Sequence, residues 1–468
     1  MKIILNIPDS LISHLKYILL WLFIILTIGY TYFFEWANTN IYLLLAVVFA
    51  IYMAINLWAN DVSNNMWPAV WAKAITLGQA IIVAIIFEAA WVIIAWGDVV
   101  NTIKWWIIDP SQFSKWSIEF IAIMLATLLG SALWVNIATF FKAPVSITHS
   151  ILWGLIWAWI TAWWIEVVNW EFMSKVAGAL VLAIFMGWII AIFIFVSIRK
   201  TILKQKNKWE AAKYWVPIYV SLMVLIFSLY LILKWFKHKL WPLKEFLENY
   251  NFDFTTTAVF ASIVLAILVY ISLIINFKNK KKSYFEDSKQ FVNKLFNLPL
   301  IFAVALLSFA HWANDVANAI WPLAAIYDSV MTSGEVIKKV WVPFWIMLIW
   351  ALSLSFWLAV FGARLIKTVW TSITKLDQTR SYSIALSAAI TVILASTYWL
   401  PVSTTQIALG WIFGIWLFRQ YLKIKNWKDK KVIEISKLKS IILSWVITFP
   451  IAWLIASGVY LIIIYLSK

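Results

Sequence analysis

Stretches of about 20 consecutive apolar residues recur along the whole chain, and they limit the possible folds more than any other feature. Such a stretch is long enough for a helix to cross the ~30 Å hydrocarbon core of a bilayer. The composition agrees, with 64% hydrophobic and 13% charged residues, against roughly 45–50% and about 25% in soluble chains. The sequence therefore predicts an all-α, polytopic integral membrane protein, located as a multi-pass protein in the cell membrane.

The predicted spans follow directly from these apolar runs. They are Tyr17–Phe34, Ile41–Trp58, Leu77–Trp96, Ile118–Phe141, Val176–Ile198, Tyr214–Leu233, Thr255–Phe277, Leu298–Ala313, Val340–Phe361, Ser383–Leu400 and Ile441–Leu466. Two shorter apolar segments, Ile147–Trp164 and Thr404–Phe418, each follow a Pro-Val-Ser sequence. Irregular backbone at membrane depth is tolerated only where it lines a protein cavity or is buried. We therefore predict that these two segments are re-entrant or broken helices close to a binding site.

One polar string occurs twice in this apolar chain. The pattern Trp-Ala-Asn-Asp-Val-x-Asn-x-x-Trp-Pro begins at Trp58 and again at Trp312, so its Asp residues are 254 positions apart (315 − 61). A Pro-Val-Ser sequence follows each copy, with its Pro 83 residues (144 − 61) and 86 residues (401 − 315) after the Asp. The shared order and spacing predict an internal duplication.

Basic residues predict the orientation of the two repeats. The loops 199–213, 278–294 and 419–439 are rich in Lys and Arg, which places them in the cytoplasm, although the basic loop 234–254 then falls outside. Matching elements would run in opposite directions, as in transporters with inverted-topology repeats. The predicted organisation is an N-terminal segment (1–16), transmembrane repeat 1 (17–198), a basic loop with a linking helix and external loop (199–254), and transmembrane repeat 2 (255–468). Loop placement also explains the net charge of +17 without a nucleic-acid partner.

The repeated Asn-Asp strings are candidate cation sites. Residues three and four apart share one face of a helix, which groups the oxygens of Asn60, Asp61 and Asn64, and likewise those of Asn314, Asp315 and Asn318. Carboxylate and carbonyl oxygens suit small hard cations. The proline after each string is expected to break the helix and free carbonyl groups. We interpret the strings as sodium or proton sites; the alternative is a polar clamp between helices.

The Pro-Val-Ser sequences are candidate anion sites. A helix N-terminus presents backbone N–H groups and a positive dipole end, so it can bind an oxyanion without Arg or Lys. The hydroxyl groups available there belong to Ser146, Thr148, Ser403, Thr404 and Thr405. The alternative is that each serine only caps its helix, which would explain a single copy as well as a site does.

Three further residues are candidates. Glu88 lies in the middle of an apolar run and has no acidic counterpart in the second half; an intramembrane acid is a functional candidate by default, but a structural hydrogen bond explains it nearly as well. His149 and Gln406 lie beside the Pro-Val-Ser sequences. We expect no cofactor and no metal other than a coupling sodium ion.

The paired Ala-Asn-Asp-Val-x-Asn and Pro-Val-Ser-x-Thr strings resemble those of the inorganic phosphate transporter (Pit) family, over about residues 41–464. The resemblance implies a sodium- or proton-coupled symporter of inorganic phosphate in the lipid bilayer that can form a homodimer, and it implies that the chain is not an enzyme. The Asn and Asp residues of the strings would hold the cations, and the five hydroxyl residues would hold phosphate. The alternatives are a sulfate permease of the same family, a non-functional engineered scaffold, and an intramembrane hydrolase using Asp61 or Asp315, against which the matched strings argue.

The chain departs from the family pattern at its glycines. Trp58, Trp67, Trp312 and Trp321 stand where the family has glycine, and Gln406 replaces a histidine. The whole chain has 35 Trp and only 12 Gly, whereas glycine is usually about 7% of residues. Because overpacking costs about 1–3 kcal/mol even for extra methylene groups, we predict an altered copy of a phosphate transporter that transports poorly or not at all.

Overall fold

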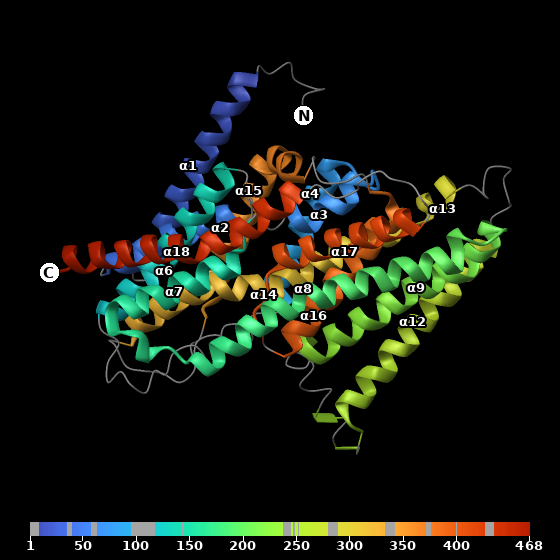
Figure 1. Cartoon of the computed structure of the whole chain (residues 1–468). Coiled ribbons are helices and arrows are strands. Elements are labelled where there is room, and N and C mark those ends of the chain that lie inside the picture. The colour runs from blue at the N-terminus through green and yellow to red at the C-terminus, as the bar shows by residue number, and fades with distance from the viewer. Residues whose placement is uncertain are drawn as a thin grey trace.

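The computed structural model describes residues 9–34, 40–57, 63–94, 118–141, 145–236, 245–246, 249–250, 252–278, 289–332, 342–370, 376–398, 400–425 and 435–468. All secondary-structure elements assigned in these ranges are helices. Figure 1 shows long helices packed side by side, with the N-terminal helix at one edge. The all-α prediction is confirmed.

The described part of the first half consists of helices. Their bounds are α1 (Asp9–Phe34), α2 (Ile41–Leu57), α3 (Ser63–Trp71), α4 (Leu77–Ile94), α6 (Ile118–Phe140), α7 (Ile147–Trp163) and α8 (Trp170–Ile198). A π-helical segment, Arg199–Leu203, continues α8. The helix α9 (Lys208–Tyr230) follows and continues as a second π-helical segment, Leu231–Phe236.

The second half begins with a long apolar helix. Its helices are α12 (Phe254–Lys278), α13 (Lys289–Leu295), α14 (Asn297–Met331), α15 (Phe344–Trp370), α16 (Gln378–Thr397), α17 (Thr404–Lys425) and α18 (Ile435–Leu466). Within the described ranges, six helices are long and apolar enough to cross a membrane, or seven if α13 and the start of α14, bent by 42°, form one span. The chain is a multi-pass membrane protein.

The break predicted at Pro322 is wrong. The helix α14 runs without interruption through the second Asn-Asp string and contains Pro322; in the first half, Pro68 likewise lies inside α3. A proline inside a helix removes one N–H donor, the partner of the carbonyl four residues earlier. Each proline therefore removes the helical partner of the carbonyl of the last motif Asn, residue 318 or 64, while the helix continues.

The helices of the two halves pack crosswise. The helix α8 of the first half packs on α16 and α17 of the second, and α18 of the second packs on α6 and α7 of the first. Helices at matching places also meet directly, α2 with α14 and α4 with α15. Each contact of α8 with the second half therefore has a counterpart in a contact of α18 with the first half.

The central helices are α6 and α16. Their most apolar 18-residue windows are 72% and 78% buried, against 17% in α12, so α12 lies at the periphery. The core of α16 carries many hydroxyl groups, and these bond back to carbonyls of their own helix: Ser383 to Thr379 at 2.9 Å and Thr391 to Ser387 at 2.7 Å. Such local bonds satisfy polar side chains in a buried helix.

Candidate functional site

In both Pro-Val-Ser sequences the serine is the N-cap of the helix that follows. The Ser146 hydroxyl accepts a hydrogen bond from the backbone N–H of His149 at 3.1 Å and begins α7. The Ser403 hydroxyl accepts one from the backbone N–H of Gln406 at 3.2 Å and begins α17. A side-chain oxygen at this position satisfies one of the helix's N-terminal donors. The capping role predicted as the alternative is therefore present in both copies, and it fixes where each helix starts.

The two helix starts lie inside the protein and touch each other. The Thr148 hydroxyl on α7 donates to the backbone carbonyl of Val402, just before α17, at 3.2 Å. The side chains of His149 and Gln406 meet at 3.3 Å between Nδ1 and Nε2. The hydroxyl residues predicted for anion binding are all buried there: Ser146, Thr148, Ser403, Thr404 and Thr405.

The contact between His149 and Gln406 joins matching positions. They are 257 residues apart (406 − 149), the same offset as between the two motif prolines (401 − 144). If an axis relates the two halves, residues that occupy matching positions and also touch lie beside it, as in a two-fold interface. The N-termini of α7 and α17 therefore meet near the centre of the crosswise packing.

The second Asn-Asp string reaches the same place through Asn314. Its Nδ2 donates to the carbonyl of Val402 at 2.5 Å, and its Oδ1 accepts from the backbone N–H of Val402 at 3.4 Å. The side chain is only 6% exposed. This amide clamps both backbone groups of one residue, which is the behaviour of the polar clamp predicted as the alternative to a cation ligand.

The remaining cation candidates are not placed with their side chains. Asn60 and Asp61 lie outside the described residues. Asn64 lies on α3 and Glu88 on α4, while Asp315 and Asn318 lie on α14, but the side chains of these four are outside what the structure describes. Of the predicted cation residues, Asn314 alone can be located at the helix contact.

Two features of the site were not predicted. The first is the backbone of Val402, which receives hydrogen bonds from both Thr148 and Asn314. The second is a hydroxyl pair behind α7, where Ser131 of α6 donates to the carbonyl of Ser150 at 3.0 Å and Ser150 donates to that of Ser146 at 2.8 Å. Any residue type supplies the same backbone groups, so a hydrogen bond to the backbone cannot be recognised from the sequence pattern.

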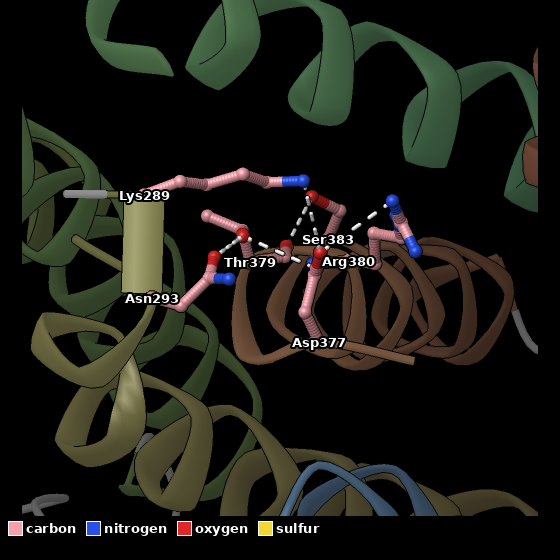
Figure 2. Close-up of polar contacts among 6 residues, drawn as sticks. All are labelled: Lys289, Asn293, Asp377, Thr379, Arg380 and Ser383. Carbon is pink, nitrogen blue, oxygen red and sulfur yellow. Dashed lines mark hydrogen bonds and ion pairs between the residues drawn. The ribbon is translucent and has the colours of Figure 1, made fainter. Parts of the chain in front are cut away.

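A separate polar cluster ties α13 to the start of α16 (Figure 2). Asp377 caps α16 by accepting from the N–H of Arg380 at 3.1 Å, and its carboxylate lies 3.5 Å from the Arg380 guanidinium and 3.8 Å from Lys289 of α13. Thr379 donates to Asn293 of α13. This cluster is at the opposite end of α16 from the Pro-Val-Ser sequence, about 30 Å away along a 20-residue helix.

These features define a class of protein. A multi-pass helical chain with two helices, α7 and α17, whose N-termini meet inside the core has the architecture of a secondary transporter. Both helices are continuous rather than broken. A family model described as the phosphate transporter family matches residues 58–456. The chain belongs to the phosphate transporter family, as the resemblance predicted, and it is not an enzyme.

Known proteins support this assignment over nearly the whole length. A Helicobacter pylori (strain ATCC 700392 / 26695) protein named "Putative phosphate permease" is 44% identical over 412 residues, covering 87% of this chain and 75% of that protein. A Pyrococcus abyssi protein of the same description is 33% identical over 422 residues, covering 90% and 98%. A solved structure described as "The sodium-dependent phosphate transporter" matches with a TM-score of 0.77 at 27% identity, covering 90% of this chain and 98% of that one.

Proposed function

We propose that this chain is a sodium-coupled symporter of inorganic phosphate in the cell membrane, and that phosphate binds between the N-termini of α7 and α17. The observation that carries the proposal is the meeting of these two helix starts through Thr148 with Val402 and through His149 with Gln406. Both ends are lined by buried hydroxyl groups. Hydroxyl and backbone N–H donors at a helix N-terminus are suited to a phosphate oxygen.

Charge balance supports a cation-coupled cycle. Each helix N-terminus is equivalent to roughly +0.5 charge, so two of them offset about one negative charge. The described residues of these two helix starts, 145–150 and 400–406, include no Lys or Arg. Each repeat adds one motif carboxylate, Asp61 or Asp315, and buried charges must be paired. One cation near each Asp-containing string would balance the loaded site.

Sodium is the proposed cation for two reasons. Amide and carboxylate oxygens are the ligands offered by the strings, with Asn60, Asp61 and Asn64 in one repeat and Asn314, Asp315 and Asn318 in the other. The structural neighbour is described as sodium-dependent. The carbonyls of residues 64 and 318, which lose their helical donors to Pro68 and Pro322, add one further hard oxygen to each site.

The crosswise packing supports two inverted repeats as the framework of the cycle. If α6, α7 and α8 correspond to α16, α17 and α18, each contact of α8 with the second half has a counterpart in a contact of α18 with the first. In inverted-repeat transporters one bundle rocks against the other around a fixed central site. The helix N-termini near the axis are in the right place for such a site.

Uptake of radiolabelled phosphate into proteoliposomes tests the proposal. We expect accumulation to need an inward sodium gradient, to persist without a proton gradient, and to resist excess sulfate. Inhibition by sulfate would support the sulfate alternative, and uptake driven by protons alone would refute sodium coupling. The chain should be assayed beside a version carrying glycine at 58, 67, 312 and 321. Equal uptake by both versions would refute the predicted defect, and no uptake by either would favour a non-functional scaffold.

A pair of variants on one helix tests the site itself. Thr148→Val removes the hydroxyl that bonds to Val402, and it should raise the KM for phosphate by about tenfold, the effect of roughly 1.4 kcal/mol. Thr161→Val is the control, because its hydroxyl bonds to the carbonyl of Trp157 and to Ser457 at the other end of α7. Equal effects of the two variants would contradict the proposed position of phosphate.

A further inference from the structure

A large apolar groove lies between α9, α12 and the start of α14, away from the helix N-termini described above. Its volume is about 910 Å³, within the size range of pockets that bury a whole ligand. Its walls are almost entirely aliphatic and aromatic, with Val220, Met223 and Phe227 from α9 and Leu265, Val269 and Leu273 from α12. Apolar walls of this kind exclude a free ion as the main occupant.

The position and length of the groove match one leaflet of a bilayer. The helix α12 lies at the periphery, with Phe260 and Leu268 68% and 58% exposed on it, so lipid surrounds the groove. The lining part of α12 runs from Leu265 to Phe277, which is ~18 Å at 1.5 Å per residue. Half of the ~30 Å hydrocarbon core is ~15 Å. One acyl chain of an ordinary phospholipid therefore fits along it.

One end of the groove is polar and positively charged. Asn276 near the end of α12, Lys294 at the end of α13 and Asn297 at the start of α14 line it together. None of the ion pairs among the described residues includes Lys294. The Oδ1 atom of Asn297 is buried with no hydrogen-bond partner in the described part of the chain. Because amide oxygen and nitrogen atoms are assigned rather than observed, this side chain can offer a donor or an acceptor to a head group.

This polar end lies at the level of a membrane surface. Trp209, which is fully buried, packs against Phe277 and Phe291 with ring centroids 5.9 and 5.5 Å apart, and these contacts hold the start of α9, the end of α12 and α13 together. The short helix α13 places Lys289 and Asn293 in the ionic cluster of Figure 2, and its last residues line the groove. Charged side chains on α13 thus mark the head-group region.

We propose that this groove binds an anionic glycerophospholipid. Its phosphate lies at Lys294, Asn276 and Asn297, and an acyl chain runs between α9 and α12 towards Leu265. The sequence that follows α12 adds charge of the same sign, with Lys at 278, 280, 281 and 282, and basic clusters beside a membrane helix attract anionic lipids. The lipid fills the space between the α9–α12 pair and the rest of the protein, and it does not depend on which ion the protein transports.

Native mass spectrometry of the full chain tests the lipid site. The purified protein is titrated with dioleoyl phosphatidylglycerol or dioleoyl phosphatidylcholine, and retained lipid is counted. We expect one tightly retained phosphatidylglycerol. Lys294→Gln should reduce the preference for it about five-fold, the effect of roughly 1 kcal/mol per basic residue, whereas the exposed Lys175→Gln should not.

A second pair of variants tests the acyl-chain part. Val269→Phe fills the groove and should weaken retention of either lipid at least tenfold, while Leu268→Phe, one residue along on the exposed face of α12, should leave it unchanged. Equal retention by both, or no preference for the anionic lipid, would overturn the proposal. If the protein were a dimer and only Val269→Phe lost the dimer mass, the groove would be an interface with a second copy of the chain. If inorganic phosphate displaced the lipid, Lys294 would bind free phosphate instead of a lipid head group.

An independent set of observations concerns the tryptophans. Trp164 ends α7 with φ 74° and ψ 171°, a region of backbone space that is essentially restricted to glycine. Buried indole nitrogens usually have a hydrogen-bond partner, yet the following have none in the described part of the chain: Trp157, Trp188, Trp321, Trp345, Trp350, Trp411 and Trp445. The 35 Trp and 12 Gly total 47 residues, and about 33 glycines are expected in 468 residues at the usual 7%.

We infer that the organism that makes this protein places glycine at Trp164 and at most of these buried positions. One codon that this organism reads as glycine, and that was translated here as tryptophan, would account for all of them. Tandem mass spectrometry of peptides from the natural protein should show glycine at 164, 321 and 411. Tryptophan at these positions in the natural protein would overturn the inference.

Discussion

Replacing Trp164 by glycine should stabilise the protein, although the substitution removes a large apolar side chain. The backbone at 164 lies in a glycine-only region, which costs another residue of order 1–3 kcal/mol. The indole is 81% exposed, so little packing is lost. Glycine also has a more flexible unfolded state, which subtracts about 0.5–1 kcal/mol. The net gain in the free energy of unfolding is therefore expected at about 0.5–2 kcal/mol.

The neighbouring residue provides the matched control. Trp163 is the last residue of α7 and has a similar indole, 41% exposed. Glycine in a helix is about 1 kcal/mol less favourable than alanine, so Trp163→Gly should destabilise. The assay is unfolding in detergent, followed by the helical circular dichroism signal. If Trp164→Gly were no more stable than the original chain, or if both variants shifted stability in the same direction, the argument from backbone conformation would be refuted.

Substitutions at three further residues examine the polar contacts. Asn314→Ala leaves the backbone N–H of Val402 without its side-chain partner, while the Val402 carbonyl keeps its hydrogen bond from Thr148. The substitution should cost about 1–3 kcal/mol for the buried N–H left unpaired and abolish phosphate uptake; thermal unfolding and uptake measure the two effects. His149→Gln places the same side chain at both matching positions and keeps a hydrogen bond to Gln406, so uptake should remain within about threefold of the original, roughly 0.7 kcal/mol, whereas His149→Ala should reduce it further. Asp377→Ala removes the N-cap of α16 and its two ionic partners, and it should lower the free energy of unfolding by about 1 kcal/mol without changing the KM for phosphate.

The sequence predicted the bounds of a helix well where apolar residues extend over its whole length. The predicted span Thr255–Phe277 lies within one residue of α12 at each end, and Ile118–Phe141 matches α6 equally well. The helix α8 begins six residues before the predicted span, after its N-cap Asn169, and Lys175 and Glu171 pair at 2.7 Å on its first turns. A span predicted from hydropathy stops at these charged residues, whereas an ion pair between residues four apart on a solvated helix face stabilises the helix.

The sequence identified individual residues of the candidate site, but it did not predict which of them contact one another. The duplicated strings identified Thr148 and Ser403 as lying at two helix starts, and the structure places both starts in contact. The role of the Val402 backbone could not be predicted, because its hydrogen bonds come from residues 254 and 88 positions away. The groove could not be predicted either, since its walls are ordinary apolar residues whose spacing only indicates membrane helices.

The two halves differ at the point where they meet, and this difference has a consequence for transport. If every pair of matching residues were identical, a phosphate near the axis would have the same donors on both sides and could bind in two equivalent orientations. His149 and Gln406 occupy matching positions and touch at 3.3 Å, but a neutral imidazole offers one N–H donor and one nitrogen acceptor on opposite sides of a ring, whereas an amide offers two N–H donors and one carbonyl acceptor. The hydrogen-bonding groups on the two sides of this contact are therefore unequal, although the helix contacts of the two halves match. An anion that carries both an O–H group and bare oxygens, as phosphate does near neutral pH, can use that inequality to bind in a single orientation, whereas fully deprotonated sulfate has no O–H group to orient.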